Sequence, residues 1–462
     1  MAITQQATRE IIEDFAREIR QKKIKASPAE STRIDFRNGI ADNREEIVYK
    51  VPLELLRFRK ENGRISSSVK SYERITGPLI GTDSQAQEVL RGFLRSKDPE
   101  KTDELKQLLK ADGQREPGII TADGFLINGN RRKVALDELR LENSADDVYQ
   151  TMKVVILPGT DDEGGPPTIT EIEQIENRYQ LQAEGKAEYY GFDAALSIRD
   201  KEFSGYTLEQ QMKDDPQYKL MGEAEFRRAV KKRRRELLDP LECVEEYLEA
   251  IGRPGEYWEV SRGTGDPEGR WQAFIDLSQS FWARAKTPSG LDKMGISETE
   301  AGEVMQAAYS VIRLRTVHNF GKLHNIMRAL PRYTAHGKNH LLELSKNTKH
   351  RLPAAELVTD NGEPLPRNAV DEKWKNKYRT EITRRLINAR EASEVGNEKG
   401  APLTLLEDAL KKLTHDNMDV EKIPATDLKA ALALANDLCS ESDKIKSQVY
   451  NLVKTAQKFN ML

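Results

Sequence analysis

Cysteine is scarce in this 462-residue chain, which contains only two. Cys243 and Cys439 lie too far apart for a CxxC zinc or redox unit, so we expect two ordinary thiols, Cys243 as a buried helical one. Long apolar runs are absent too, since none approaches the roughly 20 residues of a membrane-spanning helix. The first residues include acids and bases where a signal peptide would be apolar. These absences argue against a disulfide scaffold and a membrane protein, and they predict a cytoplasmic one.

Charge, by contrast, is abundant, because 32% of the residues are Asp, Glu, Lys or Arg. The 73 basic and 76 acidic residues almost cancel, which excludes a uniformly basic surface for nucleic acid. The basic residues are nevertheless clustered, at Arg131-Arg132, over 227–235, from Arg313 to Lys338 and from Lys373 to Arg390. We interpret the last two runs as further basic surfaces. Such segregation of charge favours a polyanionic partner.

The length predicts several domains, at roughly 100 to 200 residues for each. We expect an α+β N-terminal domain followed by a predominantly α-helical C-terminal region. The predicted parts are a helical extension over 1–45, a mixed domain over 46–167, and helical domains over 168–255, 256–355 and 369–462.

Local patterns predict the elements of the mixed domain. Apolar residues at three- and four-residue spacing predict helices, alternating β-branched runs predict strands, and Asp123-Gly124 predicts a hairpin turn. The expected helices are Arg9–Lys23, Gln85–Lys110 and Lys133–Leu141, and the expected strands are Ile47–Val51, Gly118–Thr121, Phe125–Ile127 and Met152–Leu157.

The most informative stretch joins the hairpin to the helix that follows it, as Gly129-Asn130-Arg131-Arg132. A glycine at a strand-to-helix junction permits close backbone approach, and the amino end of a helix presents free N–H groups. The two arginines add forked donors that suit phosphate. The physics alone therefore allows a polyphosphate site here, and it equally allows a solvated helix face.

This stretch resembles the core of the ParB/sulfiredoxin-like superfamily, in which a GERRxRA box follows a hairpin. Gly129, Arg131, Arg132 and Ala135 match that box, and Asn130 stands at its glutamate. Upstream, Asn62 and Arg64 resemble part of the first box of the family, although its Gln-Pro is missing. Downstream, Glu176 and Asn177 match the third box, iENxQR, with Arg178 in place of its later arginine.

The resemblance implies a ParB-like nucleotide-binding domain with a nucleoside triphosphate, CTP or ATP, and Mg²⁺ as cofactors. Transferred box by box, Arg64, Gly129, Asn130, Arg131 and Arg132 would bind the nucleotide. Glu176 and Asn177 would be the catalytic pair, with Glu176 at the metal. The sulfiredoxin branch fits less well, because that branch needs a cysteine beside the arginine box and none is near Arg131.

The resemblance continues into a helix-turn-helix-like region that would bind DNA. Tyr206–Gln211 resembles its first helix, and Glu225–Arg235 would be the second, after a turn longer than usual. The second helix is strongly basic and could follow a phosphate backbone. The alternative is a solvated helix whose basic residues pair with the acids of Glu242–Glu249. The candidate DNA-binding residues are Arg227, Arg228, Lys231, Lys232, Arg233, Arg234 and Arg235.

Near the C-terminus, apolar residues from Leu428 to Phe459 follow a heptad-like spacing. This pattern predicts either a coiled coil that forms a homodimer or a helix docked on its own chain.

Together these features predict a ParB-like protein that binds nucleotide and DNA. Nucleotide binding or hydrolysis would control how the protein clamps the duplex. The protein is expected to be prokaryotic, or to be encoded by a phage or a plasmid. Segregation, regulation, mobile-element and antiphage roles all remain open. The alternative is a ParB-fold metal-dependent nuclease or phosphotransfer enzyme, so the hypothesis of an NTPase stands beside that of a nuclease.

Overall fold

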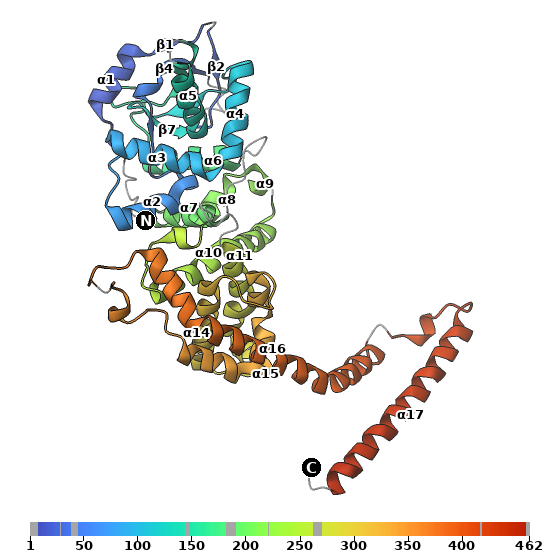
Figure 1. The fold of residues 1–462 in the computed structure, drawn as a ribbon. Helices are drawn as coiled ribbons and strands as arrows, with labels where there is room; N and C mark the ends of the chain where they lie inside the picture. The colour runs from blue at the N-terminus through green and yellow to red at the C-terminus, as the bar shows by residue number, and fades with distance from the viewer. Residues whose placement is uncertain are drawn as a thin grey trace, which may run out of the picture. The chain divides into compact units, whose positions relative to one another are not determined.

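The computed structural model describes residues 8–27, 29–37, 45–143, 147–181, 191–219, 221–261, 270–359, 361–415 and 418–458. The chain divides into two compact units, Met1–Ser393 and Glu394–Leu462. The first unit contains a sheet with its covering helices and a body of packed helices (Figure 1). The expectation of a mixed N-terminal part and a mostly helical remainder is thus confirmed at the level of fold class.

A six-stranded mixed sheet organises the N-terminal part of the first unit. The predicted hairpin is confirmed as an antiparallel pair, while the two neighbouring pairings, β6 with β8 and β5 with β7, are parallel. In order across the sheet the strands are β1 (Ile24–Lys25), β4 (Tyr49–Pro52), β8 (Thr151–Ile156), β6 (Gly118–Ile120), β7 (Phe125–Asn128) and β5 (Arg57–Phe58). A separate two-stranded sheet pairs β2 (Ser31–Thr32) with β3 (Glu46–Ile47).

Helices cover both faces of the six-stranded sheet. Alternate side chains of each strand point to opposite faces, so the strands present apolar residues on both sides that must be buried. Ile120 and Leu126 pack on one side with Val134. Their neighbours Ile119 and Ile127 pack on the other side, with Ile172 and Ile175 of the following helix. The helices of this part are α1 (Glu13–Lys22), α2 (Ser66–Thr76), α3 (Ser84–Lys97), α4 (Pro99–Asp112), α5 (Asn130–Glu142) and α6 (Ile169–Leu181), with short 3-10 turns at Leu53–Leu55, Gly63–Ile65 and Asp147–Tyr149.

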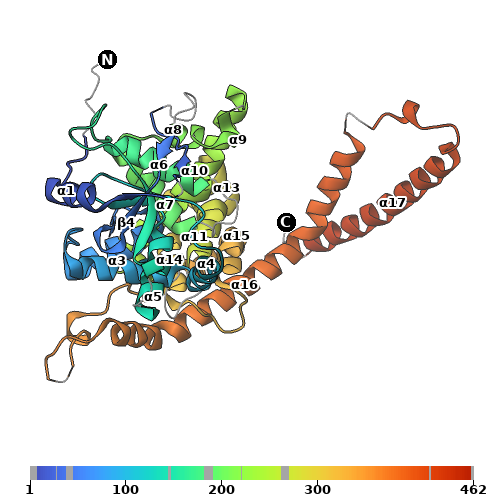
Figure 2. The same cartoon turned by 90° about the horizontal axis from the view of Figure 1, so that it is seen from above.

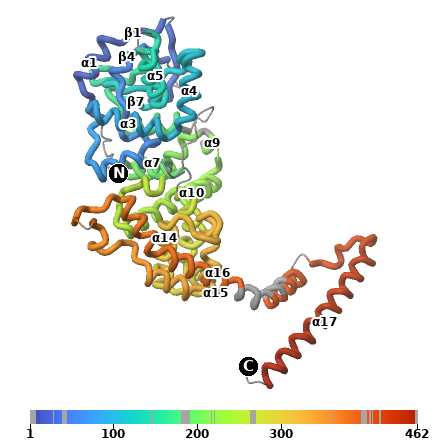
Figure 3. Tube along the Cα trace, viewed as in Figure 1, coloured from blue at the N-terminus to red at the C-terminus, as the bar shows by residue number. Residues whose placement is uncertain are grey.

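The single helix expected over Gln85–Lys110 is wrong, because the chain forms two helices there. Pro99 occupies the first turn of α4, and Asp98 before it has a non-helical backbone with φ −141° and ψ 72°. A proline disfavours helical geometry in the residue that precedes it, so the helix is interrupted at Asp98. The spacing of the apolar residues continues across this break, which is why the sequence pattern did not reveal it. Figure 3 shows α3 and α4 running in different directions.

The N-terminal segment is not a separate extension, so the predicted boundary at residue 45 is wrong. Strand β1 pairs with β4, and Ile19 of α1 is buried in the same core as the sheet. Arg9 forms a forked ion pair with the fully buried Asp123, at 2.7 and 3.0 Å. These contacts hold the segment against the hairpin.

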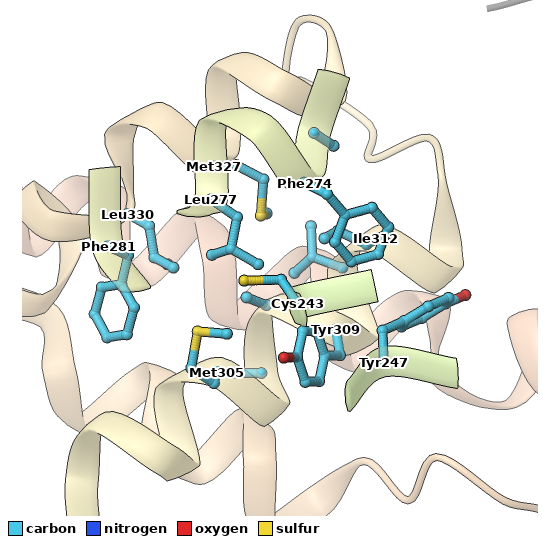
Figure 4. Close-up of a cluster of buried hydrophobic side chains, with 14 of the residues drawn as sticks. Cys243, Tyr247, Phe274, Leu277, Phe281, Met305, Tyr309, Ile312, Met327 and Leu330 are labelled. Carbon is cyan, nitrogen blue, oxygen red and sulfur yellow. The ribbon is translucent and has the colours of Figure 1, made fainter. Parts of the chain in front are cut away.

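The helical body has one main core, which the predicted boundaries at 255 and 355 do not divide; the predicted boundary at 167 lies before this core, and α6, which follows that boundary, packs on the sheet. The buried residues of this core extend from Phe192 to Ala389, and Cys243 lies fully buried among them, as expected (Figure 4). The elements are α7 (Gly191–Phe203), α8 (Leu208–Lys213), α9 (Pro216–Lys219), α10 (Glu223–Ala250), α11 (Trp271–Leu277), a π-helix (Ser278–Trp282), α12 (Ala283–Ala285), α13 (Pro288–Met294), α14 (Glu298–Leu314), α15 (Leu323–Asn347) and α16 (Arg367–Leu413), with 3-10 turns at Tyr257–Glu259 and Ala354–Glu356.

The C-terminal domain expected to begin at residue 369 begins later, within α16. Trp374, Ile382 and Leu386 of that helix are buried in the core of the helical body. The first unit ends only at Ser393. The first half of α16 is therefore part of the helical body.

The second unit contains the end of α16, a 3-10 turn at Val420–Lys422, and α17 (Leu428–Lys458). Figure 2 shows α17 as one continuous helix, and none of its described residues is buried. Leu438 and Leu452 are 52% and 69% exposed. The predicted helix is confirmed, and the two alternatives for its apolar residues, a homodimer contact and docking on its own chain, both stay predictions; Phe459 lies outside the described residues. Across the described ranges, no helix is both long and apolar enough to cross a bilayer.

Candidate functional site

The junction between β7 and α5 requires glycine at position 129. Gly129 has φ +98°, in the left-handed region, and ends the strand one residue before α5 begins. A β-carbon there would lie 3.2 Å from the Cα of Gly118 and 2.8 Å from the terminal methyl group of Met152. Both the dihedral angle and the close approach exclude larger residues. The amino end of α5 therefore lies directly against β6.

A cavity of about 360 Å³ opens beside this junction. This volume is within the range of ligand pockets, roughly 300–1,000 Å³. The structure brings six of the seven residues predicted for the nucleotide and metal site to this one cavity, and only Asn177 is not on its lining. The six are Arg64, Gly129, Asn130, Arg131, Arg132 and Glu176.

The two arginines of α5 differ in their partners. Arg131 forms an ion pair with Asp98 at 2.6 Å, whereas Arg132 is 3.5 Å from the exposed carboxylate of Glu116. Burial, and then the nearby guanidinium of Arg64, lower the pKa of Arg131. Burial also lowers the pKa of Arg132. The cavity thus holds cations that a bound anion would stabilise.

Two polar atoms at the start of α5 are buried and have no hydrogen-bond partner among the described residues. They are Oδ1 of Asn130, a residue only 7% exposed, and one terminal nitrogen of Arg132. Gly129 has no side chain with which to cap the helix. An uncapped helix end with buried, unpartnered polar groups is suited to a polar ligand.

Part of the cavity lining comes from α4, which none of the sequence motifs had indicated as part of the site. This helix contributes Leu105, Leu108 and Leu109 together with Glu104 and Asp112. The only sequence signal for it was the amphipathic spacing of the leucines. The leucines give the cavity apolar surface in addition to its charged groups.

Tyr179 of α6 also lines the cavity and was likewise missed. Burial, with smaller contributions from Asp35 and Glu116, raises the pKa of its hydroxyl to about 12. The hydroxyl therefore stays protonated and able to donate a hydrogen bond at neutral pH.

Glu176 is placed in the cavity wall and is only 2% exposed. Its Oε1 accepts a hydrogen bond from the backbone N–H of Gly63 at 2.9 Å, and its Oε2 is 3.4 Å from a guanidinium nitrogen of Arg59. Both oxygens are thus used by groups of the protein. Glu176 holds in place the loop that presents Asn62 and Arg64 to the cavity, so its contacts favour a positioning role.

Asn177 points elsewhere, although it follows Glu176 directly. Its side-chain amide donates a hydrogen bond to the carbonyl of Gln211 in α8, at 3.0 Å. Within the described ranges, no group of three or more His, Cys, Asp or Glu side chains could hold a metal ion. The side chains of Glu176 and Asn177 thus both have partners within the protein, and the Mg²⁺ site with Glu176 as its ligand stays a prediction from the family resemblance.

The predicted DNA-binding residues lie in the first half of α10. All are exposed except Arg233, which is half-buried. Arg227 pairs with Glu223, and Arg234 is 3.1 Å from Glu202 of α7. Lys232 is 3.8 Å from Glu236, at the limit of an ion pair. The stretch therefore presents a basic, solvent-accessible face.

The acids of Glu242–Glu249 do not neutralise this face. Glu242 is 3.5 Å from Lys286, and Glu246 accepts a hydrogen bond from the hydroxyl of Tyr309 at 2.7 Å. Glu245 pairs with Arg199. A helix cannot fold back on itself, so acids further along α10 find partners on other helices. The alternative of internal neutralisation is wrong for these described pairs.

The helix-turn-helix prediction is only partly matched. Thr207 and Gln210 form a capping box at the start of α8, and α8 and α10 share a small core that includes Leu208 and Phe226. The short second helix expected at Glu225–Arg235 is instead the start of a 28-residue helix, and α9 lies between the two. A helix of this length is not the compact second helix of a helix-turn-helix.

The interpretation of Arg313–Lys338 as a basic surface is wrong at its first residue. Arg313 is only 4% exposed and is 3.1 Å from Asp371 of α16. It lies on the side of α14 that faces the core, which clustered charge in the sequence could not reveal.

Comparison of the chain with protein-family models, with curated proteins and with solved structures gives no match. The ParB/sulfiredoxin-like assignment therefore remains a prediction from the three sequence boxes.

Proposed function

We propose that this chain is a ParB-like nucleotide-binding protein that also binds DNA, with nucleotide in the α5 cavity controlling how α10 engages the duplex. The observation that carries the proposal is the convergence of Arg64, Asn130, Arg131 and Arg132 on one cavity. Asn130, Arg131 and Arg132 are consecutive, whereas Arg64 comes from a distant segment of the sequence that folding brings to the same cavity.

The charged and the apolar parts of the cavity lining suit the two ends of a nucleotide. Phosphates would lie at the start of α5, where the guanidinium groups of Arg131 and Arg132 offer donors, among them the unpartnered terminal nitrogen of Arg132. The base would lie toward Leu105 and Leu108 of α4. Nucleotide pockets combine such an apolar wall with a few placed polar groups.

Direct contacts connect this cavity to the helices that support α10. Lys97 lines the cavity and forms an ion pair with Asp193 of α7 at 2.6 Å. The same carboxylate accepts a hydrogen bond from the backbone N–H of Ser67 at 3.0 Å. Helix α7 in turn packs against α10. A shift of Lys97 on nucleotide binding would therefore act on α7 and through it on α10.

The broad test is incubation with each of the four ribonucleoside triphosphates and Mg²⁺, with and without duplex DNA. We expect phosphate release that DNA stimulates, or nucleotide-dependent DNA binding without hydrolysis. Strand cleavage would instead favour the metal-dependent nuclease. Absence of both nucleotide binding and DNA binding would overturn the proposal.

The sharpest single test is Arg131→Ala, with nucleotide affinity measured by isothermal titration calorimetry. Loss of a charge-assisted hydrogen bond should weaken binding by about 10- to 100-fold. Arg115→Ala is the matched control, because Arg115 also lines the cavity but its side chain is 77% exposed. Equal effects of the two substitutions would show only a general loss of positive charge.

We further propose that the exposed apolar residues of α17 form a homodimer contact. Leu438→Asp with Leu452→Asp should shift the full-length protein from dimer to monomer in sedimentation equilibrium, because both side chains are exposed in the single chain. Lys446→Asp on the same helix should leave the dimer intact. A monomeric wild-type protein would contradict the proposal.

A further inference from the structure

A second cavity, of about 110 Å³, lies where α6, α7, α8, α9 and α10 meet. None of its lining residues is shared with the α5 cavity. Asn177 lines it, so the one predicted site residue that is absent from the α5 cavity belongs to this second cavity instead. At roughly 10–15 Å³ for each water-sized group, the volume takes about nine such groups, which is close to the number of ring and substituent atoms of one nucleobase.

Two side-chain amides leave oxygen acceptors without partners at this cavity. The amide nitrogen of Gln211 donates hydrogen bonds to the carbonyls of Ile198 and Tyr206, at 3.1 and 2.7 Å, which fixes the orientation of the amide. Its Oε1 is buried and has no partner among the described residues. Asn177 likewise uses its amide nitrogen on a carbonyl, and its Oδ1 accepts no hydrogen bond within the described part of the chain. A ligand with N–H donors suits such acceptors.

The formal charges on the lining cancel, because Arg233 of α10 and Asp215 of the turn before α9 are both present. Both oxygens of Asp215 accept hydrogen bonds from the amides of Gln217, at 3.0 and 2.9 Å. The neighbouring Asp214 pairs with Arg178 at 3.2 Å. Arg233 is half-buried and forms no ion pair with any described residue. The balance favours a neutral ligand over a phosphate group, and Arg233 offers donors to acceptor atoms of that ligand.

The rest of the lining is apolar or aromatic. Leu208 and Met212 are buried in the small core that α8 shares with α10, and Ile198 of α7 packs against it. Tyr218 of α9 is half-buried, and its ring centre lies 6.5 Å from that of Phe226. Aromatic and apolar side chains are the surfaces on which proteins hold a base that has left the stack.

Arg233 also joins the cavity to the basic face of α10. It is the half-buried member of the seven candidate DNA-binding residues, and its neighbours Lys232 and Arg234 are exposed. A phosphate backbone that follows α10 would therefore pass next to the cavity.

We propose that this cavity binds one unpaired nucleobase, supplied either by DNA held on α10 or by a free nucleoside. The lining combines hydrogen-bond acceptors, the donors of Arg233 and apolar surface, which together can read the edge of a base and hold its faces. The first source rests on the DNA binding proposed for α10. A base that is already unpaired should be favoured, because no pairing or stacking energy is lost when it enters the cavity.

The test measures the affinity of the full-length protein for DNA by fluorescence anisotropy. The probes are a fully paired duplex and duplexes with a single-base bulge of each of the four bases. The wild-type protein should bind at least one bulged duplex about tenfold more tightly than the paired one. Tyr218→Ala should reduce this ratio by about tenfold, because it removes the aromatic surface. Gln217→Ala, at an exposed position of the lining, should reduce it by about threefold.

Lys231→Gln is the matched control for the bulge preference. Lys231 is exposed on α10 and does not line this cavity, so its loss should weaken binding of paired and bulged duplexes alike and leave their ratio unchanged.

Calorimetric titration with each of the four nucleosides tests the second source. Nucleoside binding that Tyr218→Ala removes belongs to this cavity, because Tyr218 is not on the lining of the α5 cavity. A bulge preference that Tyr218→Ala removes assigns the base to DNA.

The inference is overturned if bulged and paired duplexes bind equally and no nucleoside binds. It is also overturned if Tyr218→Ala and Gln217→Ala leave both the bulge preference and the nucleoside affinity unchanged. Affinity for the paired duplex is a separate measurement, so failure of the DNA binding proposed for α10 would be seen there and not in the ratio.

Discussion

The two basic regions proposed for ligand binding differ in how much water reaches them. At the start of α5, the side chains of Arg131 and Arg132 are 20% and 15% exposed and line a cavity. On α10, Arg227 and Lys232 are 74% and 76% exposed. Partly desolvated arginines in a concave site can hold one compact anion strongly, whereas solvated ones act on a polyanion through many weak, salt-sensitive interactions.

The largest effect should come from Glu176→Ala, which removes the anchor of the cavity loop. It leaves the N–H of Gly63 without its acceptor and Arg59, only 7% exposed, with one fewer counter-charge. We expect the free energy of unfolding to fall by about 3 kcal/mol, measured by urea denaturation. Glu209→Ala, at an exposed position of α8, should cost far less. A stable Glu176→Ala protein that loses only metal-dependent activity would contradict the positioning role.

Gly129→Ala should have the next largest effect. The new methyl group would meet the backbone of Gly118 and force a left-handed residue, at a cost of about 2 kcal/mol. Nucleotide affinity should fall as well, because the start of α5 would shift. Gly113→Ala is the control, since it has φ +71° with open space around it and lines the same cavity. If the two variants were equally stable, the close approach to Gly118 would be unimportant.

Neutralising α10 should change salt dependence and leave the cavity alone. The variant combines Lys231→Gln, Arg233→Gln and Arg235→Gln. In a plot of log DNA affinity against log salt concentration, its slope should be shallower than that of the wild-type protein. The expected change is about 1 for each DNA phosphate that the protein no longer neutralises. Fluorescence anisotropy at several salt concentrations measures this slope. Nucleotide affinity, measured in parallel, should be unchanged. An unaltered slope would place the DNA-binding surface elsewhere on the protein.

The smallest effect should come from Asp98→Asn, which weakens the ion pair that holds Arg131. Because Asp98 competes with phosphate for this guanidinium, nucleotide affinity should rise by about threefold in calorimetry. Asp112→Asn, also on the cavity lining, should raise affinity far less, because its partner Arg115 is 77% exposed and its charge is screened by solvent. A fall in affinity for Asp98→Asn would mean that the carboxylate itself contacts the nucleotide.

Much of the candidate site could be predicted from the sequence, because its key parts are local. The turn at Gly124, the glycine at 129 and the helix after it follow from dihedral preferences and periodicity within a few residues. The contribution of α4 could not be predicted, because nothing local to its leucines places them in the same cavity as Arg131. The partners of Glu176 and Asn177 likewise lie more than thirty positions away along the chain.

The sequence alone determined most of the secondary structure of the sheet domain, the two unpaired thiols and the clustering of positive charge. Tertiary structure decided which of those charges face water. Arg227 stays exposed, Arg131 lines a cavity, and Arg313 is buried against Asp371. The physical reason is that local patterns fix the face of a helix on which a charge lies, but only long-range packing decides whether that face meets solvent, a ligand cavity or another helix.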